Sequence, residues 1–320
     1  MNDTESGHSR LDSIRLTEGA DKCKAVFEET CKSDKAAASV LINDGRLTFP
    51  SLFILLPQIE SFQLYRRLSP IRKTASSITA QILKPASAGR AGYLREKNGT
   101  EYAALKWILE TGKLENSLND DYEEVLDITV SVLINIYKDK NILPDVCDMI
   151  FERGSKGHHL HDLVWAYFRS SDPHALKLIA QHLASPRDAK LACSLLNIEE
   201  NTGSEKQPGS YMRWLDENGP FLYFTDESFQ LSSRPAFYRV DLERKYVQKD
   251  TPSHIQQPIV PADRNERRRL EAFRSLGNEE KRMLADYSQQ AHSDLSRWKT
   301  WIALPVDEQI KAAKQCCEEI

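Results

Sequence analysis

Histidines gather in one short stretch of this 320-residue chain, and imidazole is both a common metal ligand and a proton carrier near neutral pH. Five of the eight histidines lie within 158–182. A spacing of three residues would put His158 and His161 on one face of a helix, where Asp162 could add a carboxylate ligand. No H-E-x-x-H or paired C-x-x-C motif supports such a site. We interpret the histidines as solvent-facing turn residues, and keep a His-rich metal site or enzyme around 158–161 as an alternative.

Arginines and lysines form two stretches that could contact phosphate groups. Acidic residues interrupt the second stretch, and pairs such as Glu266 with Arg269 are typical of a solvated helix face. A formal net charge of −4 also argues against a chain that coats nucleic acid. A nucleic-acid-associated protein is therefore an alternative interpretation. The basic residues are Arg66, Arg67, Arg72 and Lys73 in the first stretch, and Arg264, Arg267, Arg268, Arg269 and Arg274 in the second.

Aromatic residues and arginines are concentrated between 214 and 246. Trp, Tyr and Arg dominate the energetics of binding surfaces, because they bury a large area and keep a polar tip. The same residues could instead seal the end of a helical array as a small core. The residues that we predict for binding are Trp214, Tyr223, Phe229, Arg234, Tyr238 and Arg239.

Catalysis has little support in the sequence. The chain contains no G-x-S-x-G, P-loop or G-x-G-x-x-G motif, so we expect no cofactor and no catalytic residues. Asp226-Glu227 is interpreted as an exposed turn. An enzyme or small-ligand protein would require a deep pocket in which His161, Cys193 or this acidic pair converge.

Helical patterns dominate the elements that must position these residues. The longest pattern covers 120–138 and is apolar around most of its circumference, so we expect a central, buried helix there. Asp34 and Thr100 are predicted as N-caps of two other helices. Further helical patterns lie over 65–83, 143–170, 265–276, 278–292 and from Pro305 to the end.

The stretch 172–197 contains the clearest pair of helices. Asp172 is an N-cap followed by Pro173 at the first helical position, and Ser185-Pro186 repeats this start signal before a second apolar stripe. The stretch resembles a HEAT-type repeat at Asp172-Pro173, Ala175-Leu176, Leu183, Arg187-Asp188-Ala189 and Leu195-Leu196. The resemblance covers about one repeat, and it implies a helical array that binds other macromolecules along a curved face.

These patterns predict a mostly α fold: stacked helical hairpins in a HEAT-like array, with a small aromatic, partly β insert and a C-terminal helical segment. The insert is expected as strands at FLYF and FYRVDL, because aromatic and β-branched residues favour strands. The predicted organisation is a disordered tail (1–13), the helical-hairpin array (14–198), an aromatic loop or hairpin with a Pro-rich connector (199–262) and C-terminal helices (263–320).

Composition indicates an ordinary globular protein. Six scattered cysteines suit reduced thiols better than a disulfide framework, and neither a secretory signal nor a membrane-length apolar run is present, so we expect a cytoplasmic protein. Residues 60–113 carry ten basic and four acidic side chains, whereas residues 114–152 carry two and ten, and we expect pairing between the two blocks. The preferred function is a non-enzymatic protein-interaction or scaffold role with a protein partner.

Overall fold

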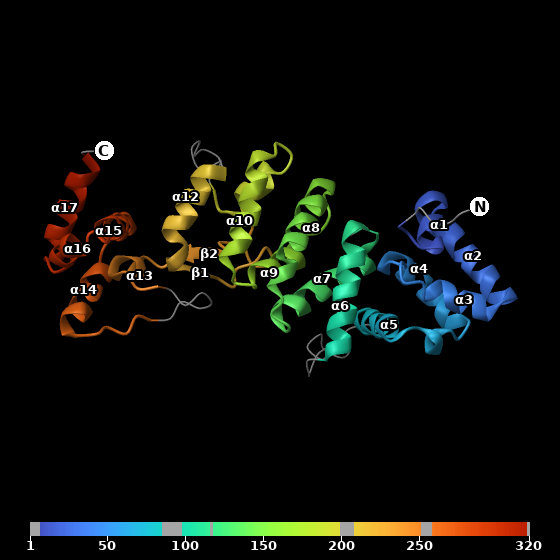
Figure 1. Ribbon diagram of the computed structural model, residues 1–320. Coiled ribbons are helices and arrows are strands. Elements are labelled where there is room, and N and C mark those ends of the chain that lie inside the picture. The colour runs from blue at the N-terminus through green and yellow to red at the C-terminus, as the bar shows by residue number, and fades with distance from the viewer. Residues whose placement is uncertain (1–6, 85–97, 116–117, 199–207, 251–257, 319–320) are drawn as a thin grey trace. The chain divides into compact units, whose positions relative to one another are not determined.

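The computed structural model describes residues 7–84, 98–115, 118–198, 208–250 and 258–318. These residues form seventeen α-helices, several short 3-10 turns and one two-stranded sheet, so the fold is mostly α as predicted (Figure 1). Contacts between Cα atoms divide the chain into two compact units, Met1–Ser170 (unit 1) and Ser171–Ile320 (unit 2). The division falls inside the array predicted over 14–198, directly before the stretch that resembles a HEAT-type repeat.

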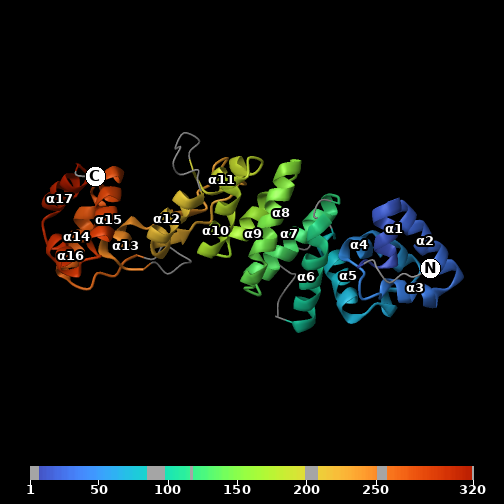
Figure 2. The same ribbon diagram turned by 45° about the horizontal axis from the view of Figure 1, so that its top comes forward.

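Unit 1 consists of helices packed on helices. In Figures 1 and 2, α6 (Gly99–Gly112), α7 (Asp120–Asn135), α8 (Leu143–Lys156) and α9 (His161–Phe168) lie side by side. Helix α7 contacts both α6 and α9, and α9 also contacts α8. Such layers bury the apolar stripe of each helix against its neighbours. Its described helices are α1 (Arg10–Glu18), α2 (Ala20–Ser33), α3 (Lys35–Ile42), α4 (Phe49–Ser61), α5 (Pro70–Ile82), α6 (Gly99–Gly112), α7 (Asp120–Asn135), α8 (Leu143–Lys156) and α9 (His161–Phe168).

Capping side chains determine where several of these helices begin. The carboxylate of Asp34 accepts hydrogen bonds from the backbone N–H of Ala36 at 2.7 Å and of Ala37 at 3.1 Å, which confirms the predicted cap of α3. The cap predicted for α6 was wrong. Asn98, not Thr100, precedes the helix and accepts a bond from the N–H of Thr100 at 2.9 Å. Both residue types cap helices, and this helix extends back to the earlier one.

The central helix predicted over 120–138 is α7. Val125, Leu126, Val130 and Leu133 are fully buried on it. The helix stops at Asn135, because Lys138 adopts a φ of 59°, which lies in the left-handed region and cannot continue an α-helix.

The N-terminal tail predicted over 1–13 includes the start of a helix. Residues 1–6 lie outside the described residues, but Arg10 begins α1 and Leu11 is 1% exposed in the core of unit 1. The prediction of disorder was wrong for residues 10–13, because Leu11 and Ile14 of this helix pack in the core that it shares with α2 and α4.

A buried carboxylate joins α1 to the start of α4. Asp12 is fully buried and accepts hydrogen bonds from Ser9 Oγ at 2.5 Å and Ser51 Oγ at 2.6 Å. It also accepts bonds from the backbone N–H of Thr48 at 3.1 Å and from its hydroxyl. Arg15 donates to Ser51 Oγ at 2.8 Å. Each oxygen of this carboxylate therefore has two donors, as a buried charge requires.

Among the residues that the structure describes, the oppositely charged blocks of unit 1 meet in two ion pairs, as expected. Lys106 Nζ lies 3.4 Å from Asp139 Oδ2, and Lys113 Nζ lies 2.5 Å from Asp145 Oδ1.

Unit 2 combines helices with a small antiparallel hairpin. The strands β1 (Leu222–Phe224) and β2 (Tyr238–Val240) coincide with the predicted FLYF and FYRVDL segments. Two helices, α12 (Pro208–Asn218) and α13 (Leu242–Val247), flank the hairpin within the region predicted as loop or hairpin. The helices of unit 2 are α10 (Pro173–Gln181), α11 (Ala189–Leu195), α12 (Pro208–Asn218), α13 (Leu242–Val247), α14 (Arg264–Arg274), α15 (Asn278–Ala291), α16 (Leu295–Ile302) and α17 (Val306–Glu318).

The stretch that resembles a repeat forms the two predicted short helices, with a different corner. Asp172 Oδ1 accepts from the N–H of His174 at 2.9 Å and Pro173 begins α10, as predicted. The second start signal was wrong, because Ser185-Pro186 lies in a turn and α11 begins only at Ala189. The N–H of Asp188 donates to Ser185 O at 3.0 Å in a tight turn, and the N–H of Ala189 donates to the same oxygen at 2.8 Å, so the turn leads directly into α11.

An aromatic core holds the C-terminal part of unit 2 together. Tyr246 stacks on Phe273 with ring centroids 4.4 Å apart and meets Trp301 edge-on at 6.1 Å. Tyr246 and Phe273 are fully buried, and the Tyr246 hydroxyl donates to Gln309 Oε1 at 2.7 Å. This core joins α13, α14, α16 and α17, and α13 also forms one wall of the pocket described below.

None of the helices in the described ranges is both long and apolar enough to cross a bilayer. The five cysteines whose side chains are described are free thiols, and four of them are buried: Cys23, Cys31, Cys147 and Cys193.

Candidate functional site

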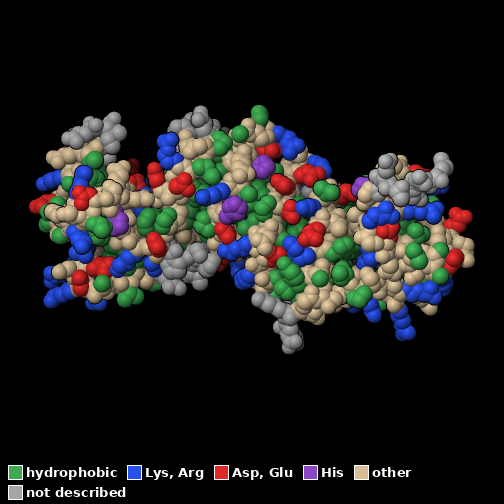
Figure 3. All heavy atoms as spheres, in the orientation of Figure 1, with side chains coloured by type: hydrophobic (Ala, Val, Ile, Leu, Met, Phe, Trp, Pro, Cys, Tyr) green, Lys and Arg blue, Asp and Glu red, His purple; other side chains and the backbone are tan. Residues whose placement is uncertain are grey.

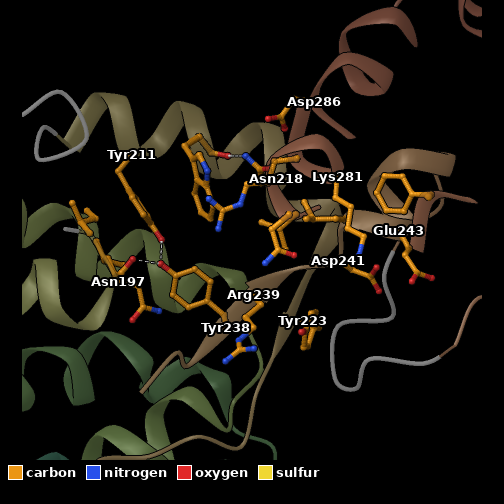
Figure 4. Close-up of a pocket in the computed structure, with 18 residues that line it drawn as sticks. Asn197, Tyr211, Asn218, Tyr223, Tyr238, Arg239, Asp241, Glu243, Lys281 and Asp286 are labelled. Atoms are coloured by element: carbon orange, nitrogen blue, oxygen red, sulfur yellow. Dashed lines mark hydrogen bonds between the residues drawn. The ribbon is translucent and has the colours of Figure 1, made fainter. Parts of the chain in front are cut away.

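A pocket of about 670 Å³ opens in unit 2 among the end of α11, helix α12, the hairpin and the first turns of α13 and α15. Its volume is in the range typical of ligand sites. In Figure 4, Tyr211 and Tyr238 stand on one side of the space, and Lys281, Asp241 and Glu243 stand on the other. Aromatic rings, amides and both signs of charge therefore face the same cavity.

Two tyrosines fix the aromatic wall. The Tyr238 hydroxyl donates to Leu196 O at 2.5 Å and accepts from the Tyr211 hydroxyl at 2.8 Å (Figure 4). Burial raises the pKa of Tyr211 well above its ordinary value, so this phenol stays protonated as the donor. The ring of Trp214 lies 5.4 Å from that of Tyr211 and 6.3 Å from that of Tyr238. The wall is a preformed cluster that links α12 to β2.

The hairpin contributes side chains from both of its faces to the pocket lining. Tyr223 lies opposite Arg239, and Phe224 lies opposite Tyr238. Because side chains alternate along a strand, Tyr238 points toward the core while Tyr223 and Arg239 share the more open face. Tyr223 is half-buried, and this burial raises the pKa of its phenol.

The three acidic side chains of the pocket already have partners. Asp241 is 4% exposed, caps α13 by accepting from the N–H of Arg244 at 3.1 Å, and has its pKa raised by burial. Glu243 receives two hydrogen bonds from Arg274, at 2.9 and 2.8 Å. Asp286 pairs with the buried Lys245.

The cations of the pocket are less fully paired. Arg239 Nη2 donates to Glu227 Oε1 at 2.5 Å. Lys281 and Arg282, on the second turn of α15, form no ion pair with any residue that the structure describes. The lining contains three cations and three anions, and the two charges that no described residue pairs with are both positive.

Four of the six residues predicted for binding line this pocket: Trp214, Tyr223, Tyr238 and Arg239. The other two belong to the 225–237 loop and do not. Phe229 packs edge-on against Phe237 at 5.4 Å, and Arg234 is exposed on the loop. The loop folds on itself, because Thr225 Oγ1 donates to Ala236 O at 2.5 Å, so it carries these two residues away from the cavity.

Sequence reasoning missed several lining residues. Tyr211 lies three residues before Trp214 on α12, and this helical spacing was the available signal. Lys281 and Arg282 gave no signal, since a basic pair in the first half of an amphipathic helix is common.

The histidine cluster is dispersed by the fold. His158 lies in the turn after α8, where its Nδ1 is 2.8 Å from Glu123 Oε1, whereas His161 begins α9. The two do not share a helical face as the spacing suggested. Among the described ranges, no group of three or more His, Cys, Asp or Glu side chains is arranged to hold a metal ion.

The basic stretches are also divided. Arg72 is only 7% exposed, donates to Asp44 O, and its guanidinium lies 5.5 Å from the centre of the Trp107 ring. It is therefore buried within the fold and cannot make the phosphate contact that the sequence suggested. Glu266 pairs with Lys249 at 2.5 Å rather than with Arg269 as predicted. Acidic, basic and hydrophobic side chains are intermixed over the face of the molecule that Figure 3 shows.

The residues considered for catalysis do not line the pocket. His161, Cys193, Asp226 and Glu227 are all outside its lining. Glu227 instead accepts hydrogen bonds from the backbone N–H of Ala236 at 2.8 Å and from Arg239. These bonds connect the two ends of the 225–237 loop.

The pocket therefore has to be interpreted from its own residues. Compared with family models, curated proteins and solved structures, the chain gives no match to any of them.

Proposed function

We propose that this chain is a non-enzymatic protein-interaction protein, and that a protein partner binds at the pocket of unit 2. The observation that carries the proposal is the lining: Trp214, Tyr223, Tyr238 and Arg239 come together around one cavity. Side chains of these types supply most of the energy at protein interfaces, above all where a well-packed cluster forms the pocket wall.

The chemistry of the lining supports binding rather than catalysis. Asp241, Glu243 and Asp286 are engaged by Arg244, Arg274 and Lys245, so they serve to hold the helices around the cavity. A general acid or base needs access to its substrate and a second reacting group in reach, and carboxylates that are held in ion pairs are poorly suited to that task.

The helices of unit 1 and the free thiols are also consistent with a protein-interaction role. The side-by-side helices of unit 1 favour a repeat array of HEAT type, which would offer a further surface to partners. The free thiols favour a cytoplasmic location.

The test is affinity capture from a native lysate with wild type and with Tyr223→Ala, followed by reconstitution of each captured protein with purified chain. Tyr223 is half-buried and no hydrogen bond of its side chain is needed for the fold, so the variant should fold. We expect a specific partner to bind wild type and to be lost with Tyr223→Ala.

Leu231→Ser is the matched control, because Leu231 is 82% exposed in the same unit and does not line the pocket. It should retain the partner. If folded Tyr223→Ala binds every partner as wild type does, the pocket is not the interface.

A further inference from the structure

The outer edge of β2 borders the pocket. In the part of the chain that the structure describes, the sheet has two strands, and β1 occupies one edge of β2. Thr225 N donates to Phe237 O at 2.9 Å, and Asp241 N donates to Phe221 O at 2.8 Å. The alternation of an antiparallel ladder between these two bonds turns the N–H and C=O of Val240 away from β1. Val240 also lines the pocket.

An open strand edge selects a particular kind of occupant. A row of outward N–H and C=O groups is a template for an added strand, and an extended peptide obtains affinity from such pairing. The side chains of an extended peptide then alternate between its two faces, so pockets beside the edge select every second residue.

Charge selects the side chains of that occupant. Within the described residues, the pocket lining and the ion-pair partners given above comprise six cations, Arg239, Lys281, Arg282, Arg244, Lys245 and Arg274, and four anions, Asp241, Glu243, Asp286 and Glu227. The two unmatched cations correspond to Lys281 and Arg282, which are neighbours on α15. Complementary charge favours a partner with carboxylates at this position.

We propose that the pocket binds an extended, acidic segment of a partner protein, which pairs with the edge of β2 at Val240 and places carboxylates against Lys281 and Arg282. The proposal rests on the proposed function and specifies the chemistry of the partner. The aromatic wall around Trp214 contacts the apolar residues that alternate with the acidic ones.

The test uses the full chain and a synthetic peptide, acetylated and amidated at its ends, of sequence Val-Glu-Tyr-Glu-Val-Glu. Binding is measured by isothermal titration calorimetry. We expect the double variant Lys281→Gln/Arg282→Gln to bind this peptide about tenfold or more weakly than wild type, because two charge pairs are lost. A peptide with Gln in place of Glu should show a loss of similar size with wild type.

Arg267→Gln/Arg268→Gln is the matched charge control, because both residues are exposed on α14 and neither lines the pocket. It should bind the acidic peptide within about twofold of wild type. Peptides N-methylated at single amides test the strand pairing, and methylation at alternate positions should weaken binding about tenfold.

Each contrary result overturns the proposal. Absence of binding by the acidic peptide, equal binding by the Lys281→Gln/Arg282→Gln variant, or indifference to N-methylation at every amide would each do so. If captured partners still depend on Tyr223 in that case, the proposed function stands and only the acidic, extended partner is wrong. Partners that ignore Tyr223 would remove both.

Discussion

Units 1 and 2 both bury polar side chains, but they use them in opposite ways. In unit 1, the carboxylate of Asp12 is enclosed by donors from Ser9, Thr48 and Ser51 and is fully buried. In unit 2, the Tyr211–Tyr238 pair is also hydrogen-bonded, and Tyr238 donates to Leu196 O, but the pair forms the wall of an open cavity. A polar network whose members are all bonded to one another holds helices in place. A polar network that borders a cavity can also bind a ligand or a partner.

Charge follows the same division. Arg15 of unit 1 is bound by Glu115 at 2.6 Å and by Ser51, so its donors are consumed within the fold. Lys281 and Arg282 of unit 2 face the pocket and have no ion-pair partner in the described ranges. Burial alone therefore does not identify a binding site. The useful criterion is whether a polar side chain still has a hydrogen-bonding or ion-pairing position that no other residue of the fold occupies.

The strongest test of the closed network is Asp12→Ala. It should lower the free energy of unfolding by about 3 kcal/mol, because it leaves several buried donors without an acceptor. Denaturant unfolding followed by circular dichroism measures the loss. Asp21→Ala on α2 is the control and should leave the free energy of unfolding nearly unchanged, since that side chain is fully exposed. A loss of less than about 1 kcal/mol for Asp12→Ala would show that the network is not closed.

A second, largely buried carboxylate in unit 1, Asp127, makes its stability depend on pH. Burial raises the pKa of Asp127 to about 7, although its ion pair with Arg153, at 2.6 Å, acts in the opposite direction. A folded pKa above the unfolded one means that the stabilisation is complete below about pH 4 and is lost as the pH rises through 7. Stability should therefore fall by about 1–3 kcal/mol between pH 5 and pH 8.

Asp127→Asn should flatten this profile, and Asp148→Asn, an exposed residue on α8, should leave it unchanged. Denaturant midpoints measured at several pH values provide the comparison. Identical slopes for wild type and Asp127→Asn would assign the pH dependence to another group.

Tyr238→Phe tests whether the pocket wall also supports unit 2. The variant loses the bonds to Leu196 O and to Tyr211, so we expect a loss of about 1–2 kcal/mol in thermal or denaturant unfolding. Tyr223→Phe should cost less than about 0.5 kcal/mol, because the hydroxyl of this half-buried residue forms no hydrogen bond with another described residue. Equal losses of stability for Tyr238→Phe and Tyr223→Phe would mean that the hydrogen bonds of the Tyr238 hydroxyl do not stabilise unit 2.

The smallest effect is expected where the charges face the pocket. Lys281→Gln/Arg282→Gln should change the free energy of unfolding by less than about 0.5 kcal/mol, since neither cation is paired within the described fold. A loss above about 1 kcal/mol would place these residues with the closed network and not with a binding site.

Much of the secondary structure could be predicted, because it depends on neighbours in the chain. The caps at Asp34 and Asp172 have the predicted hydrogen bonds, and the two strands form at the aromatic segments. The errors occurred where two local signals compete, as at Ser185-Pro186, which forms a turn before α11 begins.

The candidate site was predicted only in part. Trp214, Tyr223, Tyr238 and Arg239 were chosen for their type and clustering, and this was enough because all four lie on or next to the hairpin. Phe229 and Arg234 have the same types and the same clustering, but the bonds within the 225–237 loop turn them elsewhere. Residue type indicates what a side chain can bind and not the direction in which it points.

The sequence by itself determined the mostly α class, the starts of several helices and the hairpin, since these follow from periodicity and capping over a few residues. Only the tertiary structure decided that Leu196 and Asp286 line one cavity, that Arg72 is buried and that Lys281 faces the pocket. The physical reason is that burial and unused bonding directions depend on contacts between distant segments, and local patterns do not specify these contacts.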